Sequence, residues 1–209
     1  MTGKPRLYLI TPPVSDAAAF PPALEAALAA HDVACVLVQT GACDDASKEE
    51  TLRARCPRLQ KHGIACLIPD DPQLALRVNA DGVHIDGIGP QLQSALHALQ
   101  PGRIVGAGGL KTRDAAMTAG EAGVDYLMFG GPHDLEPHAH IVEEVAWWAE
   151  IFNVPCVGYA HNLDAIADLV HAGADFIALG DAIFGDPRGA EAAVGDAARL
   201  ILSALETVQ

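Results

Sequence analysis

Positive charge is scarce in this chain. Its 209 residues carry 13 lysines and arginines against 27 aspartates and glutamates, a formal net charge of −14, and no basic stripe runs along any predicted face. Such a field repels phosphate backbones and anionic membranes, so we expect no nucleic-acid partner and no membrane partner. A highly anionic substrate is also disfavoured unless a metal ion or backbone dipoles compensate for the charge.

Long apolar runs and paired cysteines are absent as well. No segment is long enough to span a membrane, and "MTGKPRLYLITPP" at the start has too short an apolar run for a signal peptide. The five cysteines form no CxxC pair, and Cys35, Cys66 and Cys156 lie in apolar, strand-like runs. We therefore predict reduced core cysteines and a cytoplasmic location.

The sequence does contain a regular alternation of short apolar segments and helix-like segments. The strand candidates are residues 6–10, 33–39, 64–68, 81–85, 103–107, 124–130, 154–159 and 175–180. The helix candidates are residues 20–30, 47–62, 71–79, 90–99, 112–122, 137–151, 162–172 and 189–207. Most of the strands lack polar alternation, as expected when both faces are buried, so the pattern predicts parallel strands covered by helices.

Eight such units favour a closed (β/α)8 TIM barrel of the α/β class, a single domain over residues 1–209, rather than an open doubly wound sheet. No GxGxxG follows the first strand, and "GAGG" (106–109) indicates a tight turn or a backbone that approaches a ligand closely. Asn162 and either Ser47 or Asp45 are predicted N-caps. The glycines predicted to end helices in a left-handed conformation are Gly63, Gly123 and Gly173.

Polar residues follow the ends of the predicted strands. In a closed barrel the carboxyl ends of all strands share one rim, and that rim presents loops from every unit to one pocket. The residues predicted to stand there are Thr11, Gln39, Asp70 with Asp71, His84 with Asp86, Lys111, His133 with Asp134, His161 with Asn162, and Asp181.

Carboxylates follow the third and fourth strands, which are neighbours in the predicted barrel. Asp70 and Asp86 could hold Mg²⁺, which prefers one or two carboxylates together with water and substrate oxygens. Alternatively, Asp70 and Asp71 cap the following helix and Asp86 lies in a solvated turn. His84 is either a catalytic acid–base or ligand group, or a hydrogen-bonded core histidine.

Three further features of the rim have two interpretations each. His161 is either an acid–base catalyst or a structural residue. Lys111 is either a catalytic residue that neutralises an anion or tunes a pKa, or a surface lysine. The loop that carries His133, His138 and His140 has spacing too loose for a zinc motif, and we predict that it is solvated.

Several stretches of the chain carry a resemblance to a known family. They are "RLYLIT", "LIPDDPQLALRVNADGVHIDG", "IVGAGG", "AGVDYLMFGG", "VPCVGY" and "AGADFIALGDAIF". Over nearly its whole length the chain resembles the thiamine phosphate synthase and thiazole tautomerase (TenI-like) family. The resemblance implies a (β/α)8 barrel, a transferase of thiamine biosynthesis, small-molecule phosphate precursors as ligands, and Mg²⁺ held by Asp70 and, from a shifted position, Asp86.

The resemblance also implies where substrate binds. Its predicted contacts are Gln39, Gly108, Gly109, Gly130, Gly180 and Asp181. Departures from the family pattern fall among them: Gln39 stands near a position where members carry an arginine, and Gly108 and Gly109 replace a serine and a threonine. Ala160 and His161 replace a pair of glycines that receives a phosphate. The chain is therefore expected to be a divergent member whose pyrophosphate-gripping residues are largely replaced.

Three functions stay open at this point. The chain is an enzyme of this family, a barrel enzyme for a less anionic substrate, or a non-catalytic barrel that binds a small molecule or partner for regulation. Trp147 and Trp148 indicate packing or a subunit contact, and the second interpretation would make the protein a homodimer.

Overall fold

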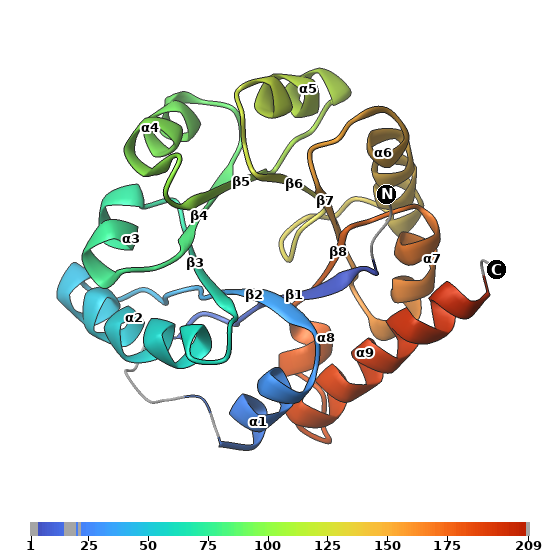
Figure 1. Cartoon of the computed structure of the whole chain (residues 1–209), viewed down its shortest axis with the longest axis horizontal. Helices are drawn as coiled ribbons and strands as arrows, with labels where there is room; N and C mark the ends of the chain where they lie inside the picture. The colour runs from blue at the N-terminus through green and yellow to red at the C-terminus, as the bar shows by residue number, and fades with distance from the viewer. Residues whose placement is uncertain (1–3, 15–19, 21, 208–209) are drawn as a thin grey trace.

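The computed structural model describes residues 4–14, 20 and 22–207, and it is a closed barrel of parallel strands (Figure 1). Each strand pairs with the next in sequence, and the last pairs with the first. The strands are β1 Arg6–Ile10, β2 Val33–Leu37, β3 Ala65–Pro69, β4 Gly82–Asp86, β5 Ile104–Gly108, β6 Tyr126–Phe129, β7 Cys156–Tyr159 and β8 Phe176–Leu179. The predicted (β/α)8 fold is confirmed.

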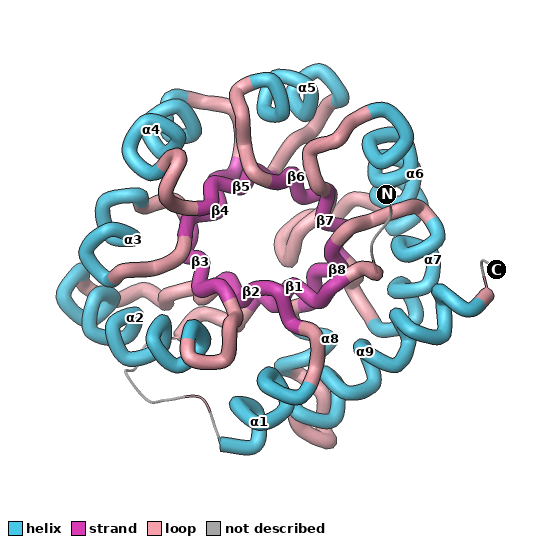
Figure 2. Tube along the Cα trace, in the orientation of Figure 1, coloured by secondary structure: helices cyan, strands magenta, loops and turns pink. Residues whose placement is uncertain are grey.

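Helices surround the barrel on its outer side, and none of the described helices lies inside it (Figure 2). They are α1 Pro22–Ala30, α2 Asp45–Gln60, α3 Pro72–Val78, α4 Pro90–Leu99, α5 Arg113–Glu121, α6 His138–Ile151, the short η1 Leu163–Ala165 continued by α7 Ile166–His171, α8 Asp181–Phe184 and α9 Ala190–Glu206. Within the described part of the chain, no helix is long and apolar enough to cross a membrane.

The predicted segments all form, with differences at their ends that have local causes. The segment 124–130 is a strand only over Tyr126–Phe129, since its ladder begins where Tyr126 pairs with Gly106 and stops before Gly130, whose φ is +74°. The four-residue helix α8 was not predicted because it is too short to show a helical period. Residue 21, at the predicted start of the first helix, lies outside the described residues.

Helix caps agree with the prediction at most positions. The three glycines after helices have positive φ (Gly63 +71°, Gly123 +91°, Gly173 +93°), and the Asn162 side chain accepts from the amide of Ala165 at 3.0 Å. The cap of α2 is Asp44 rather than Ser47 or Asp45. Asp44 is extended and its carboxylate accepts from the Ser47 amide at 2.9 Å, whereas Asp45 and Ser47 are already in the helix.

Two apolar layers hold the fold together, one between strands and helices and one inside the barrel. Cys35, Cys66 and Cys156 are buried in strands as predicted, and all five cysteines are free thiols. Trp148 is buried and stacks on Phe152 at 4.0 Å between ring centroids, so the packing interpretation is confirmed for this residue. The homodimer stays a prediction.

Strand β5 makes room for two rings inside the barrel. A Cβ atom at Gly106 would lie 2.4 Å from the Tyr126 hydroxyl, and one at Gly108 would lie 2.5 Å from Nε2 of His84. Gly109, with φ +62°, then turns the chain at the rim. The glycines of "GAGG" thus serve a tight turn, as predicted, and also admit the rings of neighbouring strands, which was not predicted.

Candidate active site

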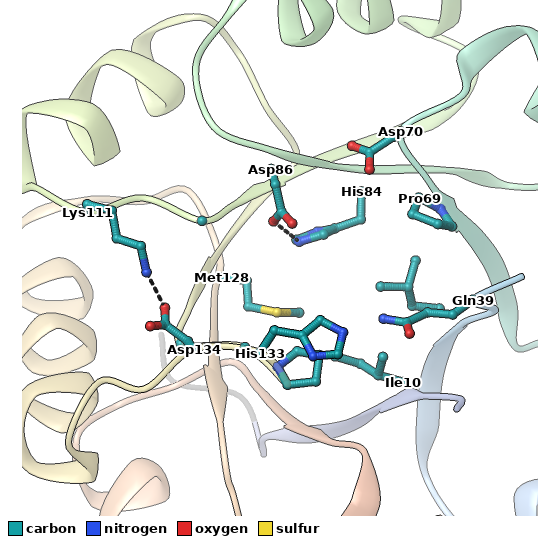
Figure 3. A pocket seen from close by; sticks show the side chains of 15 residues that line it. Ile10, Gln39, Pro69, Asp70, His84, Asp86, Lys111, Met128, His133 and Asp134 are labelled. Carbon is teal, nitrogen blue, oxygen red and sulfur yellow. Dashed lines mark hydrogen bonds and ion pairs between the residues drawn. The ribbon is translucent and has the colours of Figure 1, made fainter. Parts of the chain in front are cut away.

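A pocket of about 260 Å³ lies at the carboxyl ends of the strands (Figure 3). Its lining comes from the ends of β1 to β4 and from the loops after β5 and β6. The lining residues are Ile10, Leu37, Gln39, Pro69, Asp70, His84, Asp86, Gly109, Lys111, Met128, Gly130, Gly131, Pro132, His133 and Asp134. The floor is apolar and the charged groups stand around it.

The structure brings most of the predicted site residues to this pocket. Seven of them line it: Gln39, Asp70, His84, Asp86, Gly109, Lys111 and Gly130. Four others, Gly108, His161, Gly180 and Asp181, are not in its lining as far as the chain is described. Gly108 lies behind His84, and the other three belong to the part of the rim formed by the ends of β7 and β8.

Asp70 and Asp86 form the acidic side of the pocket. Asp70 directly follows β3 with a left-handed backbone (φ +56°), and its amide bonds to the carbonyl of His84 at 3.0 Å, which joins the two strand ends. Asp71 caps α3, accepting from the Leu74 amide at 2.8 Å, and Asp70 is not the cap. Asp86 is the last residue of β4 and is exposed at the pocket.

The charge of Asp86 influences the pKa of Asp70. Burial first, and then the negative charge of Asp86, raises the pKa of Asp70. The pKa of Asp86 is lowered, chiefly by the imidazole of His84 beside it and further by Lys111 and His133. A cation between the carboxylates would relieve their repulsion.

These residues fit Mg²⁺ better than an ion that needs a full protein cage. Among the described residues, no three His, Cys, Asp or Glu side chains form a ready-made metal cluster. Magnesium typically takes only one or two carboxylates and keeps oxygens of water and substrate phosphate as its other ligands. Asp70 and Asp86 are the residues that would hold it, and their assignment to a metal stays a prediction.

His84 is at once buried and part of the pocket wall. Only 7% of it is exposed. Its Nδ1 is 2.9 Å from the hydroxyl of Tyr126, and its Nε2 is 3.6 Å from Oδ1 of Asp86 (Figure 3). Nδ1 is thus hydrogen-bonded inside the core, as the prediction of a core histidine states, whereas Nε2 faces the pocket.

Lys111 links two loops of the rim. Its Nζ lies 2.6 Å from Asp134 and 3.6 Å from Glu136, so the loop after β5 is tied to the loop after β6. The Asp134 hydrogen bond is the largest cause of a raised Lys111 pKa, so the lysine keeps its positive charge at the edge of the pocket. His133 in the loop after β6 is exposed, in agreement with the solvated-loop prediction, and it also lines the pocket at the rim, where the sequence predicted it to stand.

The ends of β7 and β8 form a second group. The ring of exposed His161 lies 5.0 Å from that of Tyr159 at 80°, and a Cβ atom at Gly180 would lie 3.1 Å from the Tyr159 hydroxyl. Asp181 begins α8 and is exposed. Burial, followed by the Asp181 charge, raises the pKa of Tyr159. This group is negative and contains no lysine or arginine.

Sequence reasoning missed the residues behind His84. Tyr126 and Tyr8 lie inside the barrel, and their hydroxyls are 2.9 Å apart. The sequence offered one signal, tyrosines in otherwise apolar strand segments, but it did not show that both face inward.

Comparison with known proteins places these features in a family. A family model described as thiamine monophosphate synthase matches residues 7–183. A thiamine-phosphate synthase of Rhodospirillum centenum is 39% identical over 204 residues, covering 94% of this chain and 97% of the relative. The corresponding protein of Hyphomonas neptunium is 35% identical over 199 residues, with 90% of each chain covered.

Solved structures share the same architecture. Thiamine phosphate pyrophosphorylase from Pyrococcus furiosus superposes with a TM-score of 0.78 at 22% identity, over 97% of this chain and 98% of that one. A 3-hexulose-6-phosphate synthase from Salmonella typhimurium reaches 0.70 at 17% identity, over 95% and 99% of the two chains. Identities this low support a shared fold and carry no argument about function. The family match and the two curated relatives show that this chain belongs to the thiamine monophosphate synthase family.

Proposed function

We propose that this protein is a Mg²⁺-dependent transferase that joins a pyrimidine pyrophosphate to a thiazole phosphate, forming thiamine phosphate and releasing pyrophosphate. The observation that carries the proposal is the pair Asp70 and Asp86 at one pocket with Lys111, in a chain of this family. Synthases at 35–39% identity along almost the whole chain support the same substrates.

The proposed site accounts for how a chain with a net charge of −14 can bind an anionic substrate. Mg²⁺ would neutralise a bound pyrophosphate and stabilise it as a leaving group. Lys111 supplies a positive charge on the opposite side of the pocket from Asp70 (Figure 3). Metal and lysine together compensate locally for a field that is otherwise repulsive to anions.

The other predicted residues take roles that follow from their positions. His84 offers its Nε2 side to the pocket next to Asp86. The backbone at Gly109 (φ +62°) and Gly130 (φ +74°) turns at the pocket edge, where substrate can approach the main chain closely. Gln39 supplies an amide at the end of β2 that can bond to a pyrimidine ring or a phosphate oxygen.

One observation favours a second candidate function. The β7 and β8 ends carry Asp181 and no lysine or arginine, and a carboxylate beside a bound phosphate costs affinity. This favours a barrel enzyme whose second substrate is less anionic than a thiazole phosphate. The comparisons lend no support to a non-catalytic role.

The test is a direct assay with purified protein. Incubation with the pyrimidine pyrophosphate, the thiazole phosphate and Mg²⁺ is expected to yield equal amounts of thiamine phosphate and pyrophosphate. Chelation of the metal is expected to abolish both products. Absence of thiamine phosphate at high enzyme concentration would contradict the proposal, and turnover of the unphosphorylated thiazole in preference to the phosphate would favour the second candidate.

Two expectations about the protein's context remain proposals. A cytoplasmic location fits five free cysteines and a biosynthetic enzyme. The homodimer can be tested by light scattering, which would return twice the chain mass of 21.8 kDa.

A further inference from the structure

A line of polar groups crosses the barrel interior and ends at the pocket. The Tyr8 and Tyr126 hydroxyls are 2.9 Å apart, and the Tyr126 hydroxyl is 2.9 Å from Nδ1 of His84. The far side of the imidazole, Nε2, faces Asp86. Both tyrosines and His84 are buried among apolar side chains of the barrel interior.

With a neutral imidazole, and with the Tyr126 proton used within the line, two arrangements are possible. A phenol has one proton to donate, and a neutral imidazole has one N–H and one lone pair. In the first arrangement Tyr8 donates to Tyr126, Tyr126 donates to Nδ1, and the proton of His84 is on Nε2. In the second, all donations reverse, Nδ1 carries the proton, and a lone pair on Nε2 faces the pocket.

The carboxylate at the pocket end favours the first arrangement. A carboxylate only accepts, so Asp86 attracts an N–H at Nε2 and repels a lone pair there. At the opposite end, Tyr8 and Arg6 line a cavity of about 260 Å³ at the amino ends of the strands. The Arg6 guanidinium donates to Asp32 at 2.6 Å and to the Val33 carbonyl at 3.4 Å, so it does not set the direction of the Tyr8 hydroxyl.

The surrounding structure keeps the line in place. Gly106 and Gly108 leave space for the Tyr126 and His84 rings, which lie nearly parallel, 5.7 Å apart at 12°. Burial raises the pKa of both tyrosines well above the ordinary value, so each phenol keeps its proton. Tyr126 therefore keeps a hydroxyl hydrogen that it can donate to the imidazole.

We propose that Tyr126, oriented by Tyr8, is a positioning residue that holds His84 in the Nε2–H tautomer and thereby presents an N–H donor to the pocket. The nitrogen that carries the proton in a histidine is set by the hydrogen bond at the other nitrogen. An N–H can bond to an oxygen of an anionic substrate, whereas a lone pair would repel it. The catalytic consequence rests on the proposed function, and the tautomer itself does not.

The tautomer can be measured in ¹⁵N-labelled protein. Two-bond ¹H–¹⁵N correlation spectra at about pH 8.5, where free imidazole is neutral, distinguish protonated from unprotonated ring nitrogens. The His84 signals are identified by their loss in His84→Gln. The expected result is a single Nε2–H form in the wild type and a shift toward Nδ1–H in Tyr126→Phe, with a smaller shift in Tyr8→Phe. Tyr159→Phe removes a hydroxyl elsewhere in the barrel and should leave the His84 signals unchanged.

Three spectral outcomes would overturn the proposal: an Nδ1–H form in the wild type, an unchanged His84 spectrum in Tyr126→Phe, or an equal change in Tyr159→Phe. If Tyr126→Phe does not fold, Tyr8→Phe tests the proposal instead, and an unchanged His84 spectrum in that variant would overturn it. In kinetics, we expect Tyr126→Phe to lower kcat about tenfold with little change in KM, because an outer partner of a site residue typically matters by 10- to 100-fold. A wild type with no synthase activity but the expected spectra would refute the proposed function and leave this inference standing.

Discussion

Two parts of the barrel rim differ in how their polar groups are supported. At the pocket, formed by the ends of β1 to β4 and the loops after β5 and β6, His84 is fixed by Tyr126, Asp70 is tied to the His84 carbonyl, and Lys111 is held by Asp134. At the ends of β7 and β8, His161 and Asp181 are exposed and negative charge is unopposed by lysine or arginine among the residues described there. The difference favours the first part as the place of the proposed chemistry, since among the described residues opposite charges and a preorganised imidazole converge there.

The largest expected effect comes from the acidic pair. Asp70→Asn and Asp86→Asn each keep the shape of the side chain and remove a charge that the proposed function assigns to metal binding, so we expect kcat/KM to fall by about 100-fold or more. The matched substitution at the other part of the rim, Asp181→Asn, should change kcat/KM by less than about fivefold or raise it. Steady-state kinetics over a range of Mg²⁺ concentration measure both. A larger loss of kcat/KM in Asp181→Asn than in Asp86→Asn would contradict the assignment of the chemistry to the pocket.

A pair of glycine substitutions gives the next largest effect. A Cβ atom at Gly108 meets His84 at 2.5 Å and Asp86 at 3.2 Å, whereas one at Gly180 meets the Tyr159 hydroxyl at 3.1 Å. Gly108→Ala should lower the free energy of unfolding by about 1–3 kcal/mol and displace the imidazole, with a loss of activity. Gly180→Ala should lower both the free energy of unfolding and the activity by a smaller amount. Urea unfolding and activity assays check this, and equal costs at the two glycines would contradict it.

Lys111 should affect substrate binding more than stability. Its ion pair with Asp134 is exposed on the lysine side (60%), so Lys111→Met should change the free energy of unfolding by less than about 1 kcal/mol. The KM for the pyrophosphate substrate should rise about tenfold as a positive charge near the anion is lost. Lys61→Met, at the end of α2, removes the same charge far from the pocket and should leave KM unchanged. Equal effects of the two variants would mean that only net charge matters.

Alkaline pH should change stability without any effect at neutral pH. Burial raises the pKa of Tyr8 and Tyr126 in the folded state, and that of Cys156 to about 12. The folded state then holds protons that the unfolded chain has already released. Stability is therefore complete below about pH 9 and falls as pH rises through 9 to 12, by up to about 1.4 kcal/mol per pH unit for each group.

Urea unfolding at several pH values tests this fall and the contrast between the two parts of the rim. Tyr126→Phe should reduce the alkaline slope more than Tyr159→Phe, because the pKa of Tyr126 is raised well above its ordinary value, whereas the pKa of Tyr159 is raised less. A slope that is the same in the wild type and Tyr126→Phe would contradict the raised pKa.

The fold was largely predictable because strand and helix periods are local signals. Eight apolar segments spaced by helices specify the barrel, and the rule that sites lie at carboxyl ends then brings Asp70, His84, Asp86 and Lys111 together. What could not be predicted depends on contacts between distant strands. The inward direction of Tyr126 depends on the register of β6 against β5, and the partner of Lys111 depends on the path of the loop after β6.

The most direct test of the account is a crystal structure with Mn²⁺, which replaces Mg²⁺ and has an anomalous signal, together with pyrophosphate. We expect an anomalous peak within bonding distance of Asp70 and Asp86, with the pyrophosphate bridging from the metal toward Lys111. A peak at Asp181, or pyrophosphate bound with no metal between the two carboxylates, would contradict the assignment of the chemistry to the pocket.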